Sequence, residues 1–298
     1  MKNYIVHIEL TYYEKTKIGT DSLTGKKIQI NLITGGHQRK VGTKVSLTNL
    51  ISELNLDKTE KIITPLIDKF LSEQKNIVVT DKAIQDKLIE IVSDNSNSKR
   101  TGRFGASSRG LCLRRQMFDY TGDAKKLDMI DTTLQNLFND GVWRHIRWQM
   151  MGLMSGALTD VETKVSSEKY PSFGGSIDGI GFNEKYGKYG FELKGTSYMT
   201  DSVKDMHLKQ IHTYFVLDPE IKVFSVIYED KRTQDWREFL VYPDTKILTE
   251  VKAEMQSLED GVAFFEYPMV KEQCRLRQGK EYQMCPYRNE CLEFNNGN

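Results

Sequence analysis

The chain has 298 residues, of which 39% are hydrophobic and 28% charged, with a net charge of +1. This composition allows the buried core of one large domain or two smaller ones, and the balanced charge means that any DNA binding must depend on local basic clusters. No apolar run is long enough to span a membrane and the amino terminus has no signal-peptide profile, so we expect a cytoplasmic protein without membrane association.

The first hundred residues predict a small α/β unit. Alternating patterns predict strands over Tyr4–Glu9 and Lys27–Thr34 around a polar turn at Leu23–Lys26. Helical periodicity follows over Ser46–Phe70 and Thr80–Val92. No set of chemically reactive side chains stands out here, so the unit is either a docking or DNA-guiding module or an elaboration packed on the rest of the chain.

The stretch Ser93–Ser108 is polar and rich in Gly and Ser, which is typical of a linker or mobile loop. We therefore expect two parts, an accessory region over residues 1–98 and a larger domain over residues 99–298.

A helical pattern covers Leu134–Gly152. Its stripe at spacings of four, three and four residues contains Gly141, His145, Trp148 and Gly152. His145 therefore has a defined facing direction, although a lone histidine on such a stripe is more often packed in a core.

The remaining pattern predicts an α/β fold with a mixed central sheet flanked by helices. One helix crosses between the third and fourth strands at Val203–Leu217, and a last helix covers about Thr245–Phe265. The five expected strands are Ala157–Val165, Ser172–Phe182, Tyr189–Gly195, Lys222–Glu229 and Arg237–Tyr242.

The second and third of these strands form a predicted hairpin that carries charged side chains. Glu192 and Lys194 are two residues apart and share a face, and the pairing brings Asp178 alongside. Carboxylate oxygens bind Mg²⁺ together with substrate phosphates, and an ammonium group orients a nucleophile or offsets developing charge. The hairpin predicts a metal-dependent phosphodiester hydrolysis site, and an ordinary hairpin with solvated charges is the alternative.

In the helix after this hairpin, Gln210 and Tyr214 are four residues apart and lie on one face. The order Gly141-x-x-x-His145, Asp178, Glu192-Leu193-Lys194, Gln210-x-x-x-Tyr214 resembles the RecB-like branch of the PD-(D/E)XK nuclease superfamily over about residues 105–294. The resemblance implies a restriction-endonuclease-like core with an N-terminal extension and a cysteine-stapled C-terminal tail.

The resemblance also implies roles for individual residues. The metal ligands would be His145, Asp178, Glu192 and the Leu193 carbonyl, with Glu162 as a further acidic residue one strand earlier. Lys194 would position the attacking water, while Gln210 and Tyr214 would line the DNA side and hold the lysine and the scissile phosphate.

Cysteine usage gives a second line of inference. The chain has only four cysteines, and they are Cys112, Cys274, Cys285 and Cys291. Four thiolates suit a tetrahedral zinc or a 4Fe–4S cluster. The division into one and three resembles the iron–sulfur staple of AddB-type and CRISPR-adaptation RecB-like nucleases, although ten residues separate Cys274 from Cys285 where the familiar pattern has two. Zinc, or four scattered core cysteines, are the alternatives.

Local basic residues next to these segments are expected to contact phosphates, because a guanidinium group suits a phosphate. They are Arg114, Arg115, Arg144 and Arg147. The expected function is a Mg²⁺- or Mn²⁺-dependent deoxyribonuclease, an exonuclease on DNA ends or single strands in recombination, repair, replication or CRISPR-associated processing. No phosphate-binding loop is present, so a helicase or other recombination or replication proteins would act in trans. A catalytically idle nuclease fold used for DNA binding or assembly is the competing hypothesis.

Overall fold

The computed structural model describes residues 17–20, 27–30, 60–73, 78–94 and 102–293. Its contacts divide the chain into two compact units, Met1–Asp57 and Lys58–Asn298. This division differs from the expected one at residue 98. The physical reason is that α3 (Lys82–Asp94) and α2 (Thr64–Glu73) both pack against α5 (Thr132–Met154) of the second unit.

The described part of the first unit is a strand pair. β1 (Lys17–Thr20) runs antiparallel to β2 (Lys27–Ile30). The strand expected at Lys27–Thr34 is confirmed over the range of β2. The strand expected at Tyr4–Glu9 and the turn at Leu23–Lys26 lie outside the described residues.

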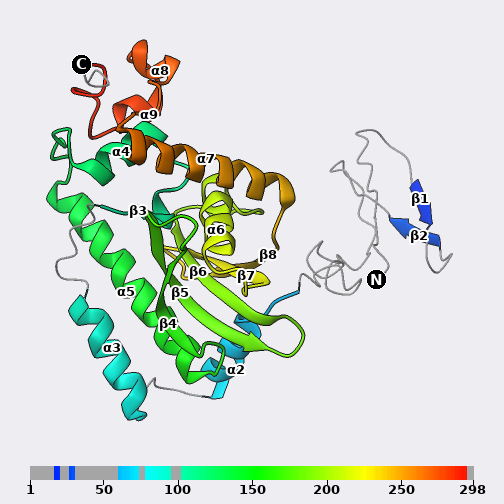
Figure 1. The fold of residues 1–298 in the computed structure, drawn as a ribbon. Coiled ribbons are helices and arrows are strands. Elements are labelled where there is room, and N and C mark those ends of the chain that lie inside the picture. The colour runs from blue at the N-terminus through cyan, green and yellow to red at the C-terminus, as the bar shows by residue number, and fades with distance from the viewer. Residues whose placement is uncertain (1–16, 21–26, 31–59, 74–77, 95–101, 294–298) are drawn as a thin grey trace. The chain divides into compact units, whose positions relative to one another are not determined.

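The second unit is built on a six-stranded mixed sheet, drawn in green and yellow in Figure 1. β5 pairs antiparallel with β4 and with β6, β6 pairs parallel with β7, and β7 pairs antiparallel with β8. The short β3 runs parallel to the start of β5. The strands are β3 (Phe104–Gly105), β4 (Asp160–Ser166), β5 (Phe173–Asn183), β6 (Gly187–Thr196), β7 (Val223–Asp230) and β8 (Trp236–Val241).

Helices flank this sheet, so the expected α/β class and mixed sheet are confirmed. Carboxylates cap the two longest helices, because Asp131 accepts a hydrogen bond from the Leu134 amide and Asp244 accepts one from the Ile247 amide. The remaining helices are the short 3-10 helix η1 (Ala106–Ser108), α4 (Leu113–Thr121), α6 (Asp205–Leu217), α7 (Thr245–Phe264), α8 (Glu272–Arg275) and α9 (Gly279–Gln283).

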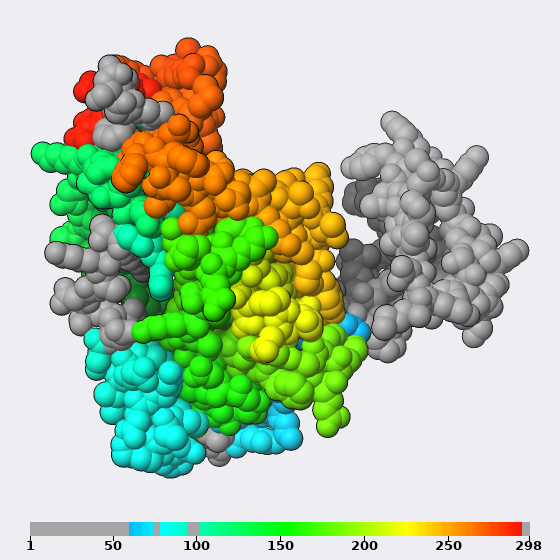
Figure 2. All heavy atoms as spheres, in the orientation of Figure 1, coloured from blue at the N-terminus to red at the C-terminus, as the bar shows by residue number. Residues whose placement is uncertain are grey.

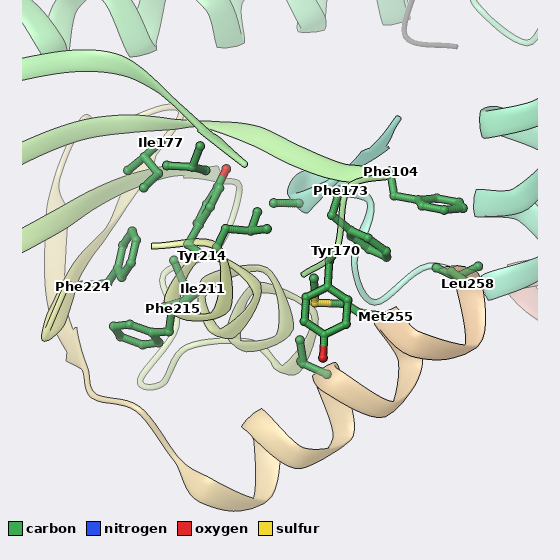
Figure 3. Close-up of a cluster of buried hydrophobic side chains, with 14 of the residues drawn as sticks. Phe104, Tyr170, Phe173, Ile177, Ile211, Tyr214, Phe215, Phe224, Met255 and Leu258 are labelled. Atoms are coloured by element: carbon green, nitrogen blue, oxygen red, sulfur yellow. The ribbon is translucent and has the colours of Figure 1, made fainter. Parts of the chain in front are cut away.

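The sheet separates two buried clusters, and β7, an interior strand between β6 and β8, contributes to both. All eight of its side chains are buried, and they alternate between the faces. Phe224 belongs to the cluster under α6 and α7, where Figure 3 shows it beside Tyr214 and Phe215. Val223 and Ile227 belong to the cluster under α5.

Two sequence predictions are corrected here. The helix expected over Ser46–Phe70 is not continuous, since residues 60–63 are not helical and α2 begins only at Thr64, followed by Pro65 in its first turn. The expected linker ends early. Phe104 within it is 2% exposed and stacks on Tyr120, so the segment after Gly102 belongs to the core.

The C-terminal tail, orange and red in Figure 2, lies against α4. The Tyr287 hydroxyl donates to Asp119 at 2.8 Å, and the Leu127 amide donates to the Pro286 carbonyl at 2.9 Å. These contacts join the tail to α4 and to the segment that follows it. No helix among the described ranges is long and apolar enough to cross a membrane.

Candidate functional site

The site lies where the hairpin of β5 and β6 comes apart. The ladder of backbone pairs ends at Gly179 and Phe191. Beyond it, the Leu193 amide donates to Asp178 Oδ2 at 2.7 Å. The Asp178 carboxylate thus takes the place of a strand partner in the fork between the two strands, and it is 8% exposed.

One face of the fork receives a histidine from α5. His145 Nδ1 is 3.3 Å from Asp178 Oδ2, and about a third of the histidine side chain is exposed. Trp148, one turn along the same stripe, is 1% exposed and belongs to the α5 core cluster together with Leu193. The helical stripe therefore packs one member in the core and presents His145 at the site.

The opposite face carries the lysine. Lys194 Nζ lies 2.6 Å from Glu192 Oε1 and 2.9 Å from Gln210 Oε1. The Gln210 amide group donates back to Glu192 Oε1 at 2.8 Å. One helical turn later, the Tyr214 hydroxyl donates to the Ser176 carbonyl at 2.6 Å. Gln210 and Tyr214 on α6 therefore fix the lysine and β5 in place.

The two carboxylates titrate differently. Burial favours protonation of both, but His145 beside Asp178 and the Leu193 amide outweigh it and lower the pKa of Asp178. At Glu192, burial and then the Asp178 charge raise the pKa to about 7, against the smaller opposing effect of Lys194.

The two cationic groups hold their protons. Burial disfavours the charged form of His145, but Asp178 and Glu192 overcome it and raise its pKa to about 9. The same two carboxylates raise the pKa of Lys194 in spite of its burial. At neutral pH the site thus contains two protonated bases next to two acidic groups.

One carboxylate oxygen of the site has no hydrogen-bond partner among the described residues. Glu192 Oε2 is buried, and within the described part of the chain it accepts no hydrogen bond. Such an oxygen is costly unless a donor or a cation reaches it. Two carboxylates and an imidazole are also suitable ligands for Mg²⁺ or Mn²⁺, so the residues fit a divalent cation. As they are arranged here, the described ranges contain no group of three or more His, Cys, Asp or Glu side chains that could hold a metal ion.

Gln149 also contacts the site, and the sequence prediction missed this residue. Gln149 is fully buried one turn after His145, and its amide nitrogen donates to Glu162 Oε1 at 2.8 Å and to the Asp178 carbonyl at 3.0 Å. Its Oε1 is buried and, among the described residues, has no partner. The spacing of four from His145 was the only signal in the sequence that pointed to it.

Glu162 itself has an unusual backbone. Its φ is +51°, in the left-handed region, and the ladder of β4 and β5 omits it opposite Asp178. Its other carboxylate oxygen accepts from the Ser176 hydroxyl at 2.6 Å. Strained backbone of this kind concentrates at functional sites. The hydrogen bonds from Gln149 and Ser176 hold the Glu162 carboxylate beside the fork.

The arginines expected on the DNA surface are instead engaged with protein groups. Arg144 is 8% exposed and pairs with Glu229 and Asp140, and Arg147 lies 2.6 Å from the same Glu229, with a third of its side chain exposed. The buried Glu229 carboxylate explains this inward orientation, because it must be neutralised.

The other two arginines lie at the tail. Arg114 is 4% exposed and donates to the Pro268 carbonyl at 3.0 Å, over the rings of Phe118 and Tyr267. Arg115 is 3.8 Å from Asp119 and lines the cysteine cavity described next.

All four cysteines come together although one is far from the others in sequence. They line one cavity of about 30 Å³ with Arg115 and Glu281, and all are free thiols. Burial raises the pKa of the Cys274, Cys285 and Cys291 thiols, and the charge of Cys112 contributes to each shift. A cationic group bound in this cavity would have the opposite effect on the thiols.

No protein-family model matches the sequence, and no significant match is found among curated proteins. Among solved structures, one described as SSO0001 is 14% identical with a TM-score of 0.40, covering 71% of this chain and 98% of that one.

Two further similar structures are of LHK-Exo. Its complex with dAMP is 14% identical with a TM-score of 0.40, covering 56% of this chain and 92% of that one. The alkaline exonuclease LHK-Exo from Laribacter hongkongensis is 15% identical with a TM-score of 0.37, covering 59% and 95%. At these scores the similarity does not establish a shared function.

Proposed function

We propose that the chain is a metal-dependent deoxyribonuclease that hydrolyses phosphodiester bonds at the fork of β5 and β6. The observation that supports this most is the convergence of Asp178, Glu192 and Lys194, with Lys194 Nζ 2.6 Å from a glutamate whose second oxygen has no partner among the described residues. Asp178, Glu192 and His145 would hold Mg²⁺ or Mn²⁺, with the Leu193 carbonyl and Glu162 as further ligands.

A bound divalent cation would lower the pKa of water and offset charge on the phosphate. The protein residues supply the positioning. Gln210 holds Lys194 against Glu192. In this proposal the ammonium group positions the nucleophilic water and offsets charge on the phosphate. Tyr214 fixes the helix to β5 through the Ser176 carbonyl.

The four-cysteine cavity supports a second part of the proposal. We propose that Cys112, Cys274, Cys285 and Cys291 hold a 4Fe–4S cluster, with zinc as the alternative, because four free thiols from α4's start and the tail line one cavity. Its role would be structural, joining the tail to α4.

The competing hypothesis is an idle nuclease fold that only binds DNA or partners. The intact set of two carboxylates and a paired lysine favours an enzyme, since a binding module has no use for a buried carboxylate with an unpaired oxygen. We propose that the enzyme is an exonuclease that acts on DNA ends or single strands. Its pathway would be recombination, repair, replication or CRISPR-associated processing, with a helicase acting in trans.

The test is to incubate the purified protein with end-labelled linear and circular single-stranded DNA in Mg²⁺ or Mn²⁺. We expect metal-dependent cleavage that EDTA stops, and release of short products from the linear probe alone would identify an exonuclease. Lys194→Met should lose cleavage while still binding Mn²⁺, because an ammonium group is no ligand. Binding of DNA without cleavage in either metal would favour the idle fold.

A further inference from the structure

One face of α6 carries a third polar residue beside the two already described. His207, Gln210 and Tyr214 follow at spacings of three and four, so they share one face of the helix. Gln210 reaches Lys194 on β6, and Tyr214 reaches Ser176 on β5. His207 makes the corresponding contact on β7, where its Nδ1 is 2.6 Å from the Tyr228 hydroxyl.

The contacts of Tyr228 favour one of the two neutral tautomers of His207. The Lys204 amide donates to the Tyr228 oxygen at 3.1 Å, and a backbone N–H can only donate. Because the phenol oxygen already accepts this hydrogen bond, its own hydrogen is free to be donated to His207 Nδ1, and we infer this direction for the contact. A neutral imidazole that accepts at Nδ1 carries its hydrogen on Nε2, where it is a donor.

The surroundings keep the ring neutral. Burial and then the charges of Lys194 and Lys204 lower the pKa of His207 to about 4. Tyr228 is the remaining titratable group in contact with the ring. His207 is thus a neutral donor over the physiological range.

The position of this donor places it beside the lysine of the site. Lys194 and Tyr228 are register partners on adjacent parallel strands, so their side chains lie next to each other on the face that α6 covers. The ring is partly exposed, and no described residue accepts a hydrogen bond from its Nε2.

We propose that His207 is a substrate-binding residue, which donates its Nε2 hydrogen to a non-bridging phosphate oxygen of the DNA strand next to the phosphate held at Lys194. This inference rests on the proposed nuclease function. An uncharged donor adds a directional contact and leaves the charge of the site to Lys194 and the cation. It requires the Tyr228 hydroxyl, which selects the tautomer.

The experiment measures the affinity of the full chain for a fluorescent single-stranded DNA oligonucleotide, with Ca²⁺ as the divalent cation and the probe checked for integrity on a gel. The variants are His207→Phe, which keeps a ring and removes the donor, and His207→Gln, which keeps a donor. We expect His207→Phe to weaken binding about tenfold and His207→Gln to stay within about threefold of the wild type.

The salt dependence separates a neutral donor from a cation. Each phosphate contact by a cationic side chain contributes about one to the slope of log affinity against log salt. We expect His207→Phe to keep the wild-type slope, and we expect the ratio of wild-type affinity to His207→Phe affinity to stay constant between about pH 6 and about pH 8.

Tyr228→Phe provides a second variant that leaves His207 in place. Without the hydroxyl the tautomer is no longer selected, so we expect about threefold weaker binding at unchanged slope. Wild-type affinity in both His207→Phe and Tyr228→Phe, or a slope lowered by about one in His207→Phe, would overturn the inference while the proposed function stands. A wild-type chain that neither binds nor cuts DNA would overturn both.

Discussion

Glu192 is buried beside Asp178, and this proximity determines how the site responds to pH. Its pKa is raised to about 7, first by burial and then by the Asp178 charge, while that of His145 is raised to about 9. A metal ligand must be deprotonated, so protons compete with the cation at both residues below these values. We expect Mn²⁺ affinity to rise as pH increases from about 6 to about 9 and to level off above.

Isothermal titration of Mn²⁺ across this range, repeated in buffers of different ionisation enthalpy, measures both affinity and proton release. Binding at neutral pH should release protons, because His145 and part of Glu192 are protonated there. His145→Ala should weaken affinity and flatten the upper part of the profile. A pH-independent affinity in the wild type would return His145 to a packing role.

Gln149 carries a prediction of its own because both of its donor contacts support the site. Replacing it with leucine removes the bonds to Glu162 and to the Asp178 carbonyl, and contacts of this outer kind contribute about 10- to 100-fold to affinity or activity. We expect Gln149→Leu to reduce the hydrolysis rate at least about tenfold.

The matched control is Gln135→Leu on the same helix, where the side chain is exposed and donates a hydrogen bond to Asn139 on the helix surface. That variant should hydrolyse DNA at the wild-type rate. Equal rates for Gln149→Leu and Gln135→Leu would show that the buried amide has no part in the site.

Sequence patterns predicted the residues of the site better than their partners. The helical stripe and the period of two placed His145, Glu192 and Lys194 correctly on their elements, because these periodicities are local. The buried pairs were not visible. Arg144 turns inward to Glu229, which lies on another element far along the chain, and no local pattern reports such a contact.

At the scale of elements, the hairpin was predictable and its fork was not. Alternation placed β5 and β6 within a few residues, but the ladder ends at Gly179 because the Asp178 side chain takes the Leu193 amide. This arrangement also depends on His145, which reaches the Asp178 carboxylate from α5, far away in the sequence. The periodicity alone placed the start of α2 too early in the sequence. Pro65 is the signal that the helix begins near this residue.

The start of α2 depends on one carboxylate of β8. Glu238 is 4% exposed and accepts from the backbone amides of Ile62, Ile63 and Thr64, as well as from the Thr64 and Ser225 hydroxyls. The first amides of a helix have no partner within it, and removing a buried acceptor leaves them unsatisfied.

We therefore expect Glu238→Ala to lower the free energy of unfolding by about 3 kcal/mol and to increase amide hydrogen exchange at the start of α2. Glu184→Ala, at an exposed position of the β5–β6 turn, is the control and should change stability by less than about 0.5 kcal/mol. Unchanged exchange at Ile62 and Ile63 in Glu238→Ala would show that this cap is dispensable.

At the scale of the whole molecule, the four cysteines bring the start of α4 together with the C-terminal tail. Anaerobically purified protein should contain about four iron atoms per chain and show a broad visible absorbance at about 400 nm. Cys112→Ser should lose as much iron as Cys285→Ser despite its distance in sequence, since both line one cavity. A content of one zinc per chain would instead show that the four cysteines hold a structural zinc ion.

Loss of the cluster should cost stability more than chemistry, because the tail also has direct contacts to α4 such as the Tyr287 bond to Asp119. Thermal unfolding of Cys112→Ser compared with the wild type measures this. Metal-free protein whose stability does not change in Cys112→Ser would leave the cysteines as ordinary core residues.

The central claim is that Glu192 is a ligand of a catalytic metal, and the single-turnover rate of DNA hydrolysis as a function of Mn²⁺ tests it most directly. Glu192→Gln keeps the shape of the side chain and removes its charge, whereas Glu184→Gln makes the same change at an exposed turn position. We predict that Glu192→Gln loses at least about a thousandfold in rate at saturating Mn²⁺ while Glu184→Gln matches the wild type. Wild-type hydrolysis by a folded Glu192→Gln variant would contradict the proposed site.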